Sequence, residues 1–162
     1  MRFKWWLFDN FLWVGLVIGA GVGGFLYSVD WPKELTIAGL GSVLGYFYFV
    51  QRQRLSEAQL FKDLFSEFNE RYDEMNDDLA AALDAESLDP GLKKRLVDYF
   101  NLCAEEFLYY QRGYIYPEVW QAWCRGMLQY LRGRAVRALW DAETGTGSYY
   151  GLTMEEIEDA AR

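Results

Sequence analysis

Histidine is absent from this chain of 162 residues, and cysteine and proline are scarce, with two and three copies. Without an imidazole there is no Ser-His or Cys-His nucleophile pair and no histidine-bound metal. The adjacent carboxylates Glu105/Glu106 and Glu155/Glu156 diverge on a helix, because sequence neighbours do not share a helix face. We therefore name no catalytic residue and no metal ligand, and we expect neither an enzyme nor a protein that carries a cofactor.

The charge is strongly negative overall but uneven along the chain. The formal net charge is -8 at pH 7, yet eight of the 16 basic residues lie within residues 93–137. An acidic protein repels the phosphates of a long nucleic acid. We expect no binding to long nucleic acid, although the basic stretch could hold one small anion.

Two uncharged runs occupy most of the first 51 residues, at 10–29 and 35–51. A helix of about 20 residues rises about 30 Å, the thickness of the hydrocarbon layer of a membrane. Aromatic residues, which favour membrane interfaces, cluster near the ends of both runs. Asp30 and Pro32 suit a turn followed by a helix start. The sequence predicts a transmembrane helical hairpin over residues 1–54, with spans at about 10–29 and 33–51.

Two other interpretations of the first run are disfavoured. A signal peptide lacks its small-residue cleavage site here, and a second apolar run follows directly. A buried hairpin of a globular core would not need such length or aromatic ends. Arg2, Lys4, Arg52 and Arg54 flank the hairpin, whereas its loop holds only Lys33, so both termini are expected in the cytoplasm.

Glycine recurs at every fourth position in both runs, at Gly15, Gly19 and Gly23 and again at Gly41 and Gly45. Small residues at this spacing let two helix backbones approach closely in lipid. The pattern fits packing within one hairpin and packing between hairpins of several copies equally well.

Residues 55–162 are predicted to form a cytoplasmic all-helical domain. Apolar residues at alternating steps of four and three form a seam, which predicts a long stalk helix over about 55–84; they are Phe61, Phe65, Phe68, Tyr72, Met75, Leu79 and Ala82. This seam could pair with other copies or pack on its own domain. Further helices are predicted after Asp89-Pro90, after Pro117 and after Thr153, with Gly113 ending the first. No strand pattern occurs, so the fold class is all-α, and the reducing compartment predicts that Cys103 and Cys124 are unpaired core thiols.

A cluster of arginines with interleaved aromatic residues is the most suggestive local feature. Arginine binds phosphate through two parallel hydrogen bonds, and aromatic faces stack on bases. The candidate ligand-binding residues are Arg132, Arg134, Arg137, Arg125, Tyr130, Trp140, Lys94 and Arg95. Pairing of these cations with acidic residues of the chain, or contact with anionic lipid headgroups, explains the same pattern.

The stretch from Tyr99 to Trp120 reads YFNLCAEEFLYYQRGYIYPEVW. With the order of two short spans and an acidic stalk, it resembles small bacterial membrane proteins that have an all-helical cytoplasmic domain. Within that group it is most similar to the membrane effectors of type III CRISPR systems that sense cyclic tetra-adenylate. The resemblance carries over no site residue. It implies a homotetramer in the bacterial inner membrane that binds this cyclic nucleotide and perturbs the membrane during phage infection.

Two functions therefore remain open. The first is an antiviral effector whose cytoplasmic domain binds a cyclic oligoadenylate and then perturbs the membrane. The alternative is a structural or adaptor membrane protein whose basic patch binds anionic lipid or an acidic partner.

Overall fold

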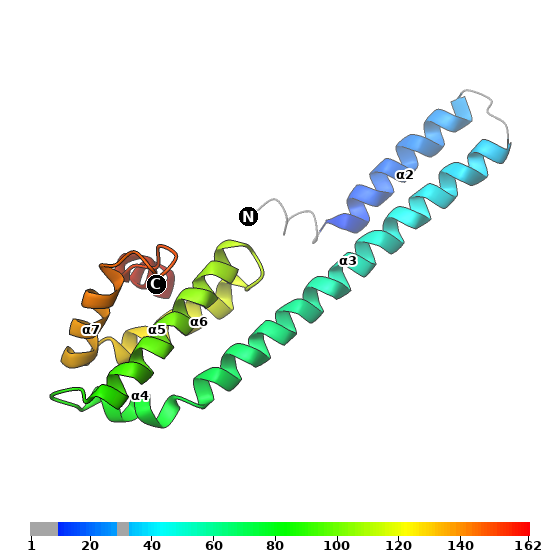
Figure 1. The fold of residues 1–162 in the computed structure, drawn as a ribbon. Coiled ribbons are helices and arrows are strands. Elements are labelled where there is room, and N and C mark those ends of the chain that lie inside the picture. The colour runs from blue at the N-terminus through cyan, green and yellow to red at the C-terminus, as the bar shows by residue number, and fades with distance from the viewer. Residues whose placement is uncertain (1–9, 29–32) are drawn as a thin grey trace. The chain divides into compact units, whose positions relative to one another are not determined.

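The computed structural model describes residues 10–28 and 33–162, and every regular element in these ranges is an α-helix (Figure 1). This confirms the all-α prediction. The helices are α2 (Phe11–Ser28), α3 (Lys33–Asp73), α4 (Asn76–Leu83), α5 (Pro90–Gln111), α6 (Pro117–Tyr130), α7 (Arg134–Thr144) and α8 (Met154–Ala161). The predicted turn at Asp30 and Pro32, and the basic residues Arg2 and Lys4, lie outside the described residues. The chain divides into two compact units, Met1–Gln59 and Leu60–Arg162, and α3 contributes to both.

In the first unit, α2 packs beside the first part of α3. The Phe11 ring lies edge to face on Phe47, with centroids 6.4 Å apart, and the Arg54 guanidinium lies 4.3 Å from the centre of the Phe11 ring. Gly15 lies directly under the Phe47 ring, where a methyl group would not fit. Gly23, Gly41 and Gly45 have no such neighbour within this unit. The glycine spacing thus serves close approach within the hairpin at Gly15, Gly19 makes an ordinary contact with Val43, and Gly23, Gly41 and Gly45 have no described neighbour.

Many large apolar side chains of this unit are exposed. Those that are at least half exposed are Trp13, Leu16, Val17, Phe25, Ile37, Leu44, Tyr48, Phe49 and Leu55. Among the residues that the structure describes, no helix has both the length and the hydropathy of a membrane span.

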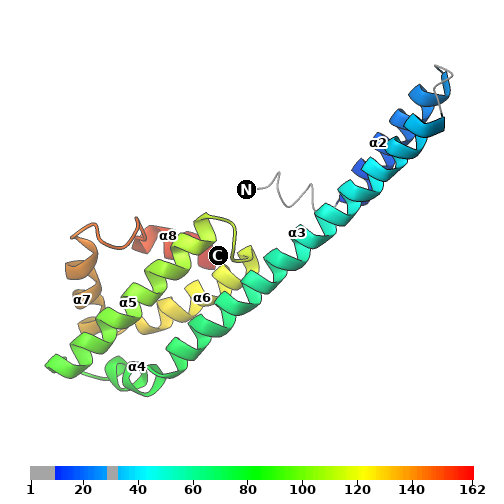
Figure 2. The same ribbon diagram turned by 45° about the vertical axis from the view of Figure 1, so that its right-hand side comes forward.

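The second unit is a domain built from the last part of α3 and from helices α4 to α8. Helices α5 and α6 lie side by side, α4 contacts α5, α6 and α7, and α8 packs on α6 (Figure 2). Its core is rich in aromatic rings, and Trp120, Trp140, Phe68, Phe100 and Phe107 are almost completely buried. Cys103 and Cys124 are buried free thiols, as predicted.

The stalk helix predicted over 55–84 is interrupted, which corrects that prediction. Helix α3 ends at Asp73, and the Met75 N–H donates to the Tyr72 carbonyl at 2.9 Å, a tighter turn than an α-helix makes. The turn directs α4 into the domain, where Met75, Leu79 and Ala82 are at most 4% exposed. The burial of these side chains thus stabilises the turned chain more than the lost helical hydrogen bonds would stabilise a continuous helix. From Phe68 to Ala82 the seam packs on its own domain.

The predicted helix ends are confirmed where a capping residue sets them. The Asp89 carboxylate accepts hydrogen bonds from the N–H groups of Gly91 at 2.7 Å and Leu92 at 3.0 Å. After α5, Gly113 adopts a φ of 77°, which favours glycine. The Thr153 hydroxyl accepts from the Glu156 N–H at 3.3 Å and begins α8.

Replacing the cap of α5 tests its contribution to the domain. We expect Asp89→Ala to lower the free energy of unfolding by about 1 kcal/mol, because two N–H groups lose their acceptor. Asp89→Asn is the matched control, since asparagine caps helices as well as aspartate does. Urea denaturation of the full-length protein followed by tryptophan fluorescence measures both. An equal loss in the two variants would contradict the capping role.

Candidate functional site

Three of the predicted ligand-binding arginines are free on the surface of the second unit. Arg125 lies on α6, Arg132 follows the end of α6, and Arg134 is the first residue of α7. All three are exposed, and none has a hydrogen bond or ion pair with another described residue. Arg132 and Arg134 flank Gly133, which provides no side-chain hydrogen bond to the start of α7.

Two other predicted arginines are neutralised by neighbouring carboxylates. The Arg137 Nε lies 2.9 Å from Asp141 Oδ1, one turn further along α7. The Arg95 Nε lies 2.9 Å from Asp78 Oδ2 of α4. Lys94, next to Arg95 on α5, is exposed. The predicted basic residues therefore do not form one site, and Arg132 with Arg134 is the pair that stays available.

The two predicted stacking residues point into the domain, which corrects their expected role. Trp140 is only 2% exposed and packs edge to face on Phe100, with ring centroids 4.9 Å apart. The Tyr130 hydroxyl lies 2.7 Å from the Tyr72 hydroxyl, and the Tyr130 ring packs edge to face on Tyr99. Trp140 therefore has no free face for a base, whereas Tyr130 is half-buried and lines the pocket described below.

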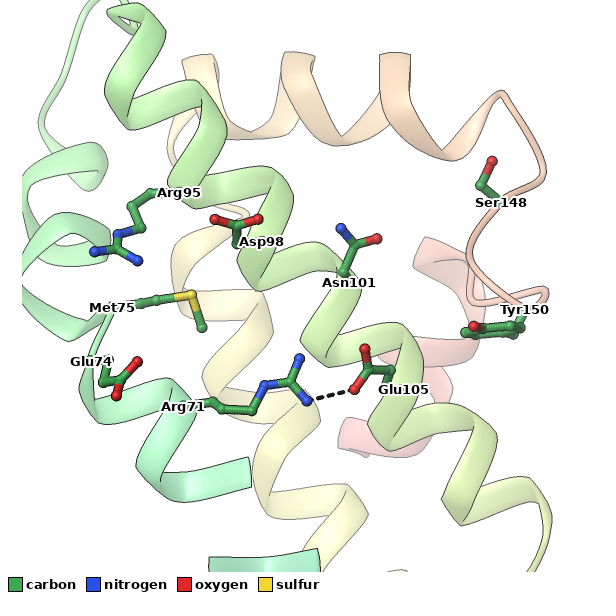
Figure 3. Close-up of a pocket in the computed structure, with 9 residues that line it drawn as sticks. All are labelled: Arg71, Glu74, Met75, Arg95, Asp98, Asn101, Glu105, Ser148 and Tyr150. Carbon is green, nitrogen blue, oxygen red and sulfur yellow. Dashed lines mark hydrogen bonds and ion pairs between the residues drawn. The ribbon is translucent and has the colours of Figure 1, made fainter. Parts of the chain in front are cut away.

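A polar hollow of about 410 Å³ opens between α3, α5 and the loop that follows α7 (Figure 3). Its lining residues are Arg71, Glu74, Met75, Arg95, Asp98, Asn101, Glu105, Ser148 and Tyr150. The Arg71 guanidinium donates to Glu105 at 2.6 Å, and this hydrogen bond is the main cause of the raised pKa of Arg71. Arg95 is also paired, while Glu74 and Asp98 add negative charge. This hollow is unsuited to an anion, because its cations are already engaged.

A second hollow, here called the aromatic pocket, lies where α3, α5 and α6 meet. It has a volume of about 220 Å³. The residues that line it are Phe68, Asn69 and Tyr72 of α3, Tyr99 and Glu106 of α5, and Ala122, Trp123, Gly126, Met127 and Tyr130 of α6. Five of these ten residues are aromatic, and of these Phe68 and Tyr99 are almost completely buried.

Glu106 is a buried carboxyl without a partner in this pocket. It is 6% exposed and makes no hydrogen bond or ion pair with a described residue. No side-chain oxygen of the described residues is both fully enclosed and without a hydrogen bond, so the Glu106 oxygens must reach the open space of the pocket. Burial raises the pKa of Glu106 to about 8, Glu105 adds to the rise, and Arg71 opposes it.

Glu106 was not singled out from the sequence, because Glu105 and Glu106 were considered only as a catalytic pair, and sequence neighbours diverge on a helix. The spacing did contain a signal. Tyr99, Cys103, Glu106 and Tyr110 recur at steps of four, three and four, which places Glu106 within the apolar stripe of α5. A charged residue at such a position is rarely buried without a partner.

The pH dependence of stability tests the environment of Glu106. Its folded-state pKa is raised, so the folded protein holds a proton that the unfolded chain releases above about pH 4.5. This group therefore makes stability fall as the pH rises from about 4.5 to about 8, by as much as about 5 kcal/mol, and has no further effect above that.

We expect Glu106→Gln to remove that fall, because glutamine does not titrate. Urea denaturation at several pH values in this range measures the difference between variant and wild type. Glu118→Gln, which removes an exposed carboxylate on α6, is the control and should keep the wild-type slope. Identical slopes for the wild type and Glu106→Gln would show that the carboxyl is not desolvated.

Among the described residues, no cluster of cysteine and acidic side chains is placed to hold a metal ion. Comparison with protein-family models, with curated protein sequences and with solved structures finds no match to this chain.

Proposed function

We propose that this protein is a membrane-anchored sensor of a small polyanion. In this proposal the N-terminal hairpin inserts into the bacterial inner membrane, and the helical domain binds a cyclic oligoadenylate in the cytoplasm. Binding then perturbs the membrane as an antiviral response. The protein acts by binding and has no catalytic step.

The availability of Arg132 and Arg134 carries the proposal. The chain has a net charge of -8, and Arg71, Arg95 and Arg137 are all paired with carboxylates. Two adjacent arginines that stay unpaired in such a protein have a strong electrostatic preference for an external anion. The start of α7 between them adds backbone N–H groups and the positive end of the helix dipole, which also favour phosphate.

Anchoring in the membrane is supported by the surface of the first unit. Trp13, Val17 and Ile37, each about 70% exposed, represent the large apolar side chains that this unit leaves uncovered. An exposed apolar surface of this extent marks a site of contact with a membrane or with another protein. We propose that lipid chains make this contact, since residues 10–29 carry no charge and the aromatic residues near their ends suit a membrane interface.

A tetramer fits the symmetry of the proposed ligand. Cyclic tetra-adenylate has four equivalent phosphates, and one copy of the chain offers one free pair, Arg132 and Arg134. Four copies related by a fourfold axis would give each phosphate an equivalent pair. Tighter binding to one arrangement of the domains would shift the population of arrangements, and α3 would carry the change because it contributes to both units.

The alternative is a structural or adaptor role in which Arg132 and Arg134 contact anionic lipid headgroups. The burial of Trp140 favours it, because this predicted stacking residue has no free face for a base. Headgroup binding needs only the cations.

Titration with cyclic nucleotides decides between the two. The full-length protein in zwitterionic nanodiscs is titrated calorimetrically with cyclic tri-, tetra- and hexa-adenylate. We expect the protein to bind cyclic tetra-adenylate saturably. The double variant Arg132→Glu/Arg134→Glu should weaken it by roughly a hundredfold or more, because each arginine lost removes a charge-assisted hydrogen bond worth about 1.5–3 kcal/mol.

Arg112→Glu is the matched control. Arg112 is exposed at the C-terminal end of α5 and is not part of the proposed site, so this variant should bind the nucleotide as the wild type does. Absence of heat for all three nucleotides would overturn the proposal. The adaptor role would then predict that anionic lipid in the nanodisc protects residues 131–137 from hydrogen exchange, and that the double variant loses this protection.

A further inference from the structure

We infer that the aromatic pocket between α3, α5 and α6 is a binding site for a small organic ammonium ion. The inference is independent of the proposed function, because it concerns different residues and a ligand of opposite charge.

The walls of the pocket have the chemistry that binds such cations. The rings of Phe68 and Trp123 meet at 82°, and those of Tyr99 and Tyr130 meet at 75°. Aromatic rings of different orientation therefore line the pocket, and an aromatic ring attracts an ammonium group placed over its face. The Tyr72 and Tyr130 hydroxyls hold each other at 2.7 Å and fix α3 against α6.

The carboxyl of Glu106 supplies the counter-charge. It is the acidic group among the residues that line the pocket, and no lysine or arginine is among them. A bound cation would give Glu106 the ion-pair partner that the described residues do not provide. An anion would be repelled, and an uncharged ligand would leave the cost of burying the carboxylate uncompensated.

The volume of the pocket limits the size of the ligand. A water molecule occupies about 30 Å³ in the liquid, so 220 Å³ has room for about seven non-hydrogen atoms. A trimethylammonium group with a two-carbon alcohol tail has this size. Nucleotides and peptides are too large to enter completely.

Binding should be coupled to proton release. At neutral pH burial keeps the Glu106 carboxyl largely protonated, and only the ionised form attracts a cation. Charged and titratable groups from all three helices surround it. Arg71 of α3, Tyr99, Cys103 and Glu105 of α5, and Cys124 of α6 interact with it electrostatically, and Tyr72 of α3 and Tyr130 of α6 line the same pocket. Of these, the pKa values of Tyr72, Tyr99, Cys103 and Cys124 are raised by burial, so these groups stay neutral across the range in which Glu106 titrates.

The test compares choline with 3,3-dimethylbutan-1-ol, which has the same shape but carbon in place of the charged nitrogen. Tetramethylammonium and propylammonium complete the set of probes. The full-length protein is titrated by calorimetry, with tryptophan fluorescence as a second readout because Trp123 lines the pocket. We expect at least one ammonium ion to bind saturably, and choline to bind at least tenfold more tightly than the alcohol.

Glu106→Gln keeps the size of the side chain and removes its charge, so it should weaken ammonium binding at least tenfold. Glu118→Gln, outside the pocket, should leave binding unchanged. Wild-type affinity should rise about tenfold from pH 6 to pH 7, because the ionised fraction of Glu106 rises by that factor.

Three results would each overturn the inference. They are the absence of binding by all three ammonium ions at millimolar concentration, equal affinity for choline and its uncharged analogue, and an affinity that does not depend on pH. The pH series uses the wild-type protein, so the test holds even if Glu106→Gln does not fold.

Discussion

A carboxyl group without a partner lies among aromatic rings at the place where α3, α5 and α6 meet. Glu106 is 6% exposed and makes no hydrogen bond or ion pair with a described residue, and the attraction of Arg71 offsets only part of the free energy that its desolvation costs. An apolar side chain at this position would stabilise the domain more. The fold therefore keeps a polar cavity at a cost in the free energy of unfolding, as ligand-binding proteins commonly do.

Unpaired arginines are unexpected in a chain with so many acidic residues. Arg71, Arg95 and Arg137 each find a carboxylate, whereas Arg132 and Arg134 do not, although the protein has an excess of negative charge. The domain thus presents two separate chemistries. One is an exposed cationic pair at the start of α7, and the other is a pocket lined by aromatic residues and one buried carboxyl.

Local patterns predicted the helix ends well, but they did not predict which side chains the tertiary fold covers. Asp89, Gly113 and Thr153 fix helix ends through their own backbone neighbours, so the sequence suffices there. The break at Glu74 was missed because the apolar seam continues through it. The chain turns there because α4 packs against α5, α6 and α7, and these contacts are tertiary. Trp140 was predicted to stack on a base, but it lies four residues after Val136 and shares its buried face. Which face of a helix is covered depends on the tertiary fold.

The most direct test is to titrate Glu106 itself. Full-length protein with glutamate labelled with ¹³C at Cδ gives a carboxyl resonance for each glutamate, and the Glu106→Gln variant identifies the one that belongs to Glu106. We predict a pKa of about 8 in the free protein and a lower value with saturating choline. A resonance that titrates near the ordinary value of 4.5, unchanged by choline, would contradict the account.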